Sequence, residues 1–99
     1  MKKDNTTLAD VISYLEDIIE ARSTSIKDTY TSSLLKKSIA RISQKVGEEA
    51  VEVVIAANLK DKKQIISESA DLLFHLMVLW KKSGVKEKDV AKELLRRKK

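Results

Sequence analysis

Five carboxylates stand in stretches of sequence that are otherwise rich in apolar residues. Three lie close together in one segment, and two lie in a later one: Glu48, Glu49 and Glu52, then Glu68 and Asp71. On a helix, which turns 100° per residue, the first three fall at relative angles of about 0°, 100° and 40° and share one broad face. The other two are three residues apart and are therefore helical neighbours. Each segment predicts a helix with an acidic face.

A turn near residue 60 separates the two acidic segments. Glu52 and Glu68 each lie about eight residues from that turn, so an antiparallel helix pair would bring them to the same level. Carboxylates gathered in this way repel each other and lose hydration. Mg²⁺ relieves both effects, with Mn²⁺ as an alternative, because these cations prefer oxygen ligands and share their remaining positions with substrate phosphates. The pattern therefore predicts a magnesium site rather than a zinc site, since the chain has no cysteine and one histidine.

A second interpretation treats the same acids as solvated helix positions that pair with lysines. Lys45 lies on the acidic face one turn before Glu49, and is either a counter-ion or a substrate contact. His75 follows Asp71 by one turn, and by itself it indicates a hydrogen-bonded core residue as readily as a functional one. The residues alone leave both interpretations open.

Helices account for nearly the whole chain. Proline is absent and there are only two glycines, so the strongest helix breakers are rare. The apolar spacing predicts four helices, five at most, over residues 7–22, 33–58, 62–82 and 87–97. A polar connection rich in Ser and Thr covers residues 23–33 and is long enough to indicate a function. We expect a single all-α domain over residues 1–99.

Local signals mark several of the helix ends. Thr7 and Asp10 resemble a capping box, Asp61 is an expected N-cap with Gln64 three residues later, and Gly84 suits a left-handed residue after a helix. The helices over 33–58 and 62–82 are apolar on more than one side. They predict a homodimer or higher oligomer, in which both pair with a second subunit to form a four-helix bundle.

The remaining features exclude several classes of protein. The first residues lack the apolar core of a signal peptide, and the longest apolar stretch is far below the ~20 residues of a membrane span. We therefore expect a cytoplasmic protein with no membrane contact. The net charge of +5 suits an anionic ligand, but no recognition-helix motif or interleaved aromatics predict a nucleic-acid partner.

Two motifs carry a resemblance to a known superfamily. The segments KVGEEAVE (45–52) and ESADLLFH (68–75) resemble the EExxE…ExxD signature of the MazG-like all-α nucleoside triphosphate pyrophosphohydrolases. The residues that flank the acids most resemble those of the phosphoribosyl-ATP pyrophosphohydrolase family, and Thr29-Tyr30-Thr31 resembles its Ser-Tyr-Thr element. Three positions depart from that pattern: Thr29 replaces Ser, Ser38 replaces Gly and Phe74 replaces Tyr, which removes a hydroxyl.

The resemblance implies an enzyme. It would hydrolyse phosphoribosyl-ATP to phosphoribosyl-AMP and pyrophosphate with Mg²⁺, the second step of histidine biosynthesis. The implied metal ligands are Glu48, Glu49, Glu52, Glu68 and Asp71, with Glu49 as the general base. The implied substrate contacts are Lys45, Arg22, Lys36, Tyr30, Thr31 and His75. A house-cleaning nucleotide pyrophosphohydrolase with the same metal chemistry is the alternative activity, and a purely structural helical dimer is the alternative outside enzymes.

Overall fold

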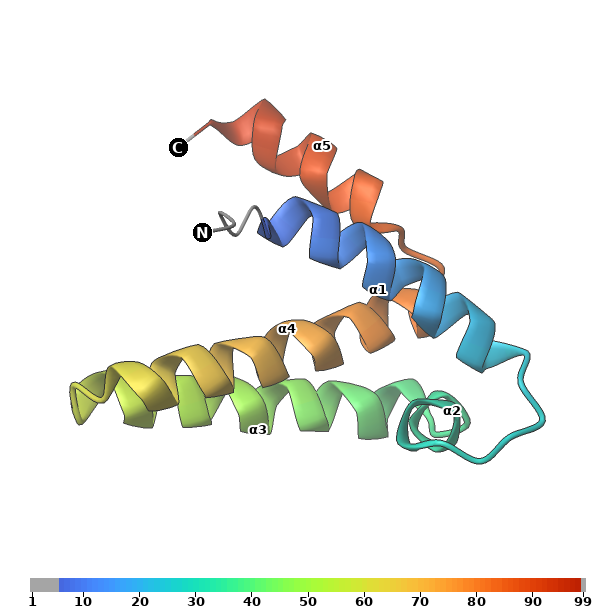
Figure 1. The fold of residues 1–99 in the computed structure, drawn as a ribbon, viewed down its shortest axis with the longest axis horizontal. Coiled ribbons are helices and arrows are strands. Elements are labelled where there is room, and N and C mark those ends of the chain that lie inside the picture. Colours follow the sequence, from blue (N-terminus) through green and yellow to red (C-terminus); the bar gives the residue numbers. More distant parts are fainter. Residues whose placement is uncertain (1–5, 99) are drawn as a thin grey trace, which may run out of the picture.

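The computed structural model describes residues 6–98, which form five α-helices and no strand (Figure 1). The helices are α1 Leu8–Ser23, α2 Tyr30–Leu35, α3 Ile39–Asn58, α4 Lys62–Ser83 and α5 Glu87–Arg97. The all-α prediction is confirmed. Residues 1–5, which carry the expectation of no signal peptide, and Lys99 of the basic tail lie outside the described part. No helix within it is long and apolar enough to cross a membrane.

Helices α3 and α4 form a long antiparallel hairpin, as the two acidic segments predicted (Figure 1). Lys60 and Asp61 close the turn, because their backbone N–H groups donate to the carbonyls of Ala57 and Ala56 at 3.1 and 3.2 Å. The Asp61 carboxylate then accepts the N–H of Gln64 at 3.2 Å, which confirms the predicted N-cap. The turn therefore fixes the register of the two helices.

The predicted helix over 33–58 is wrong at its start. Helix α2 already begins at Tyr30, inside the expected loop, and the helical structure is interrupted at residues 36–38 before α3. Both starts are fixed by side-chain caps: the Ser32 N–H donates to Thr29 Oγ1 at 3.0 Å, and the Arg41 N–H donates to Ser38 Oγ at 3.2 Å. Hydroxyl side chains compete with the helical backbone for these donors, so they divide one apolar pattern into two helices.

The core lies where α1 and α2 meet one half of the hairpin. Its buried residues come from four helices: Ile19, Leu34, Ile42, Met77 and Val78. Phe74 and Trp80 pack against this core. Helix α5 lies beside α1, and the Glu87 N–H at its start donates to the Glu16 carboxylate at 2.8 Å. None of the described helices lies beside the half of the hairpin near its turn (Figure 1).

Apolar side chains cover that free half of the hairpin. Five of them are 48 to 73% exposed: Val51, Val54, Ile55, Leu59 and Ile66. A surface of this kind on so small a chain is the feature from which an oligomer was expected.

We predict that the two glycines respond oppositely to alanine. Gly84 has φ 73°, and an added Cβ in the left-handed region costs about 1–2 kcal/mol of unfolding free energy. Gly47 is an exposed residue inside α3, where alanine adds about 0.5–1 kcal/mol. A Cβ at either position meets nothing within 4 Å, so packing does not confound the comparison. Urea denaturation of Gly84→Ala and Gly47→Ala measures both, and changes of the same sign would contradict the assignment.

Candidate metal centre and substrate pocket

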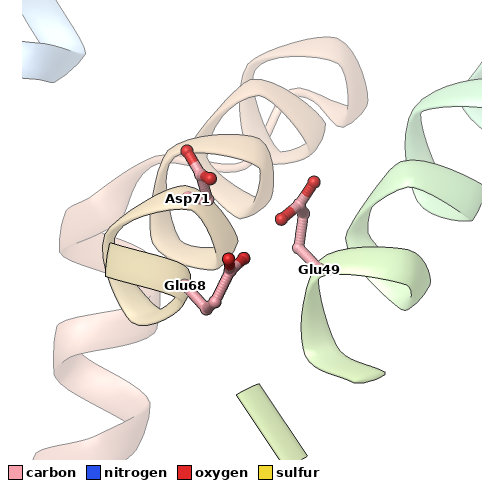
Figure 2. Close-up of side chains that lie close together, drawn as sticks. All are labelled: Glu49, Glu68 and Asp71. Atoms are coloured by element: carbon pink, nitrogen blue, oxygen red, sulfur yellow. The ribbon is translucent and has the colours of Figure 1, made fainter. Parts of the chain in front are cut away.

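Three carboxylates converge between the two long helices. Glu49 comes from α3, and Glu68 and Asp71 come from α4 (Figure 2). One oxygen from each lies within 4.8 Å of the others, which is close enough for a single ion to contact all three. The Glu49 side chain is only 12% exposed, Glu68 is half-buried and Asp71 is exposed. The cluster therefore extends from the groove between the two helices to the surface.

The charges in this cluster disfavour one another. Loss of hydration, together with the nearby charges of Glu52, Glu49 and Asp71, raises the pKa of Glu68 above its ordinary value. A hydrogen bond with Glu49 raises the pKa of Glu68 further. These are the conditions under which a hard divalent cation binds favourably, because it offsets the repulsion and accepts carboxylate oxygens as ligands. The donor set therefore fits Mg²⁺ or Mn²⁺.

The structure brings together three of the five predicted ligands. Glu52 lies outside the close group, although its charge acts on Glu68. The Glu48 side chain is 54% exposed, and it accepts a hydrogen bond from Gln44 Nε2 at 3.3 Å. Glu48 therefore lies at the rim of the site, beside the pocket described next.

A pocket of about 420 Å³ opens between α2 and the first half of α3, and we call it the α2–α3 pocket. It is lined by Tyr30, Ser33, Leu34, Lys37, Arg41, Gln44, Lys45 and Glu48. Lys45 links it to the cluster, because its Nζ lies 3.5 Å from the Glu49 carboxylate. The sequence analysis missed Lys37 and Arg41, although their four-residue spacing with Lys45 was a usable signal.

Arg22 and Lys36 lie elsewhere. They line a separate pocket of about 200 Å³, which also includes Lys81 and Lys82. Lys82 is 11 residues (82 − 71) beyond Asp71, which is about 17 Å along α4. The pocket lies where the carboxyl ends of α1, α2 and α4 meet, and cations there offset the negative ends of the helix dipoles.

The other predicted substrate contacts belong to α2 and α4. The Tyr30 ring lines the α2–α3 pocket, and its hydroxyl lies 2.7 Å from His75 Nε2. His75 is 5% exposed and lies behind Tyr30, not in the pocket wall. Thr31 is half-buried and does not line the pocket.

The chain is similar to known proteins over most of its length. A family profile described as phosphoribosyl-ATP pyrophosphohydrolase matches residues 12–98. A phosphoribosyl-ATP pyrophosphatase of Zymomonas mobilis is 51% identical over 89 residues, which is 89% of this chain and 83% of the relative. One from Azorhizobium caulinodans is 49% identical over 98 residues, covering 98% and 86%. A histidine biosynthesis bifunctional protein of Vibrio parahaemolyticus is 46% identical over 84 residues, covering 84% of this chain and 40% of that protein.

We predict that Glu68→Gln raises the melting temperature of the metal-free protein, because it removes one of the repelling charges. The same change should weaken Mn²⁺ binding at least about tenfold, since affinity follows the charge of the ligand set. Thermal melts and calorimetric titration with Mn²⁺ measure the two effects. Glu48→Gln is the matched control and should bind Mn²⁺ like the unaltered protein. An unchanged Mn²⁺ affinity in Glu68→Gln would place the ion outside the three-carboxylate cluster, and equal losses in the two variants would make Glu48 a further ligand.

Proposed function

This chain belongs to the phosphoribosyl-ATP pyrophosphohydrolase family, and we propose that it performs that hydrolysis with Mg²⁺ held by Glu49, Glu68 and Asp71. It is a phosphoribosyl-ATP pyrophosphatase of histidine biosynthesis. The observation that carries the proposed site is the meeting of three carboxylates with a cation-lined pocket, joined through Lys45. The products are phosphoribosyl-AMP and pyrophosphate.

The α2–α3 pocket receives the anionic substrate. Its volume of about 420 Å³ falls in the range of small-molecule sites. Lys37, Arg41 and Lys45 offer three positive charges to phosphate oxygens, and charge-assisted hydrogen bonds of this kind are the strong ones. Lys45 stands between the pocket and the carboxylates, so a phosphate bound there lies next to the cluster.

The carboxylates supply the chemistry at the phosphoanhydride. Glu49, Glu68 and Asp71 hold the cation, and Glu52 is the next candidate because its charge acts on the same group. When bound, Mg²⁺ neutralises phosphoryl charge and lowers the pKa of the attacking water. Glu49 accepts a proton from that water. The water oxygen bonds to phosphorus, and the bond between that phosphorus and the leaving pyrophosphate breaks. We assign this role to Glu49 because it lies at the side of the cluster nearest Lys45, which lines the pocket proposed to hold the substrate phosphates.

The active form is a homodimer or a higher oligomer of this chain. The exposed apolar side chains of α3 and α4 near the hairpin turn support it, because pairing two such hairpins buries them in a four-helix bundle. The pairing also stabilises a chain whose own buried core is small.

We predict a dimer or larger species at low micromolar concentration in light scattering. Val54→Glu places a charge on the exposed apolar face and should shift the protein towards monomer. Ile26→Glu is the control, because Ile26 is fully exposed in the connection before α2 and should leave the mass unchanged. A stable, active monomer of the unaltered protein would contradict the proposed assembly.

We also predict at least tenfold preference for phosphoribosyl-ATP over ATP. The two share a triphosphate, so discrimination rests on the additional ribose 5-phosphate and its contacts with cations. One such contact is worth roughly 1.5–3 kcal/mol, about one to two powers of ten in affinity. The measurement is the ratio of kcat/KM for the two substrates at equal free Mg²⁺.

Two arginine variants test where the substrate binds. Arg41→Gln should raise KM about tenfold or more because Arg41 lines the α2–α3 pocket, whereas Arg22→Gln should change KM little. The reverse order would move the substrate to the pocket at the carboxyl ends of the helices.

In the comparison of substrates, comparable kcat/KM for phosphoribosyl-ATP and ATP would favour a general nucleotide pyrophosphohydrolase.

A further inference from the structure

A buried histidine joins the substrate pocket to the carboxylate helix. Its Nε2 lies 2.7 Å from the Tyr30 hydroxyl, and its Nδ1 lies 2.7 Å from the backbone oxygen of Asp71. His75 is on α4, whereas Tyr30 is the first residue of α2 and is 45 positions away in sequence. One imidazole ring thus connects Tyr30, in the wall of the pocket, to Asp71 of the carboxylate cluster.

The contact with Asp71 determines which ring nitrogen of His75 must carry hydrogen. The Asp71 carbonyl oxygen can only accept, so Nδ1 of His75 must be the donor. In a neutral imidazole the other nitrogen is then an acceptor, and the Tyr30 hydroxyl donates to it. Both nitrogens are therefore used within the protein, which leaves His75 no polar atom for a substrate. Its role must be exerted through Tyr30.

We propose that His75 is a positioning residue that holds the Tyr30 ring as a nucleobase-binding wall of the α2–α3 pocket. This inference rests on the proposed function. The Tyr30 ring centroid lies 6.4 Å from that of Phe74 at 30°, and it contacts His75 edge-on at 5.9 Å, so two rings of α4 support it. The residue is still 57% exposed, so much of the ring remains accessible.

The composition of the pocket indicates what the exposed ring contacts. An aromatic surface beside Lys37, Arg41 and Lys45 matches the two halves of a nucleotide, because a base stacks on the ring and phosphates meet the cations. The chain has few aromatic residues, and among those described Tyr30 is the one that lines this pocket. An anchored hydroxyl keeps the ring in one orientation, so binding a base does not have to restrict it.

Removing the Tyr30 hydroxyl tests the anchor without removing the ring. Tyr30→Phe should raise KM for phosphoribosyl-ATP about three- to tenfold, the size of one hydrogen bond, and leave kcat within about twofold. Mn²⁺ affinity should not change, because the carboxylates are untouched. Tyr14→Phe is the matched control: Tyr14 is an exposed tyrosine on α1 away from the pocket, and its loss of hydroxyl should leave KM unchanged.

Changes at His75 separate an anchor from a packing role. His75→Gln retains a carbonyl acceptor for the tyrosine hydroxyl and should stay near the KM of the unaltered protein. His75→Leu retains bulk without an acceptor and should match Tyr30→Phe. Combining Tyr30→Phe with His75→Leu should add nothing further, because both remove the same hydrogen bond. Full additivity, or no rescue by glutamine, would overturn the positioning role.

Nitrogen NMR of the imidazole gives an answer that does not depend on turnover. The inference requires hydrogen on Nδ1 and a hydrogen-bonded, unprotonated Nε2 that changes in Tyr30→Phe. The opposite tautomer, or an unchanged KM in Tyr30→Phe, would overturn it. Failure of the proposed function appears differently, as an unaltered protein that does not hydrolyse phosphoribosyl-ATP at all.

Discussion

Repulsion among carboxylates held in one groove is the constraint on which the site depends. Glu49 faces Glu68 and Asp71 because the α3–α4 hairpin has one register, fixed by the short turn and the Asp61 cap. The hairpin keeps the charges together although their proximity raises the pKa of Glu68. Lys45 at the edge of the cluster offsets part of the repulsion, and the carboxylate oxygens are suited to a divalent cation.

Helix α2 determines which residues lie on one side of this charged groove. Helix α2 is only six residues long, yet its buried Leu34 joins the core with Ile19 of α1 and Ile42 of α3. That packing places Tyr30 and the Lys37–Arg41 segment against one side of the groove. The groove therefore has cations on one side and the carboxylates on the other, and Lys45 lies between them.

The apolar surface near the hairpin turn is exposed because the core occupies only the other end of α3 and α4. Burial of α1 and α2 against one end of α3 and α4 leaves the other end, with Val54 and Ile66, uncovered. The same two helices thus carry the carboxylate cluster on one face and an apolar surface on another. In the proposed dimer, a change that disturbs the pairing of two chains would act on helices that also position the carboxylate cluster.

The sequence by itself determined the features that arise within a few residues of the chain. Helical spacing identified the acidic faces that contain Glu49, Glu68 and Asp71, and the caps at Thr7, Asp61 and Gly84 were readable because each is a contact between near neighbours. The break between α2 and α3 was missed because the Ser38 hydroxyl caps α3 inside an apolar pattern that continues across it. The tertiary structure decided which cations face the carboxylates. The packing direction of α2 turns Lys37 and Lys36, adjacent in sequence, into different pockets. It also joins Tyr30 to His75 across 45 residues, which no local spacing could indicate.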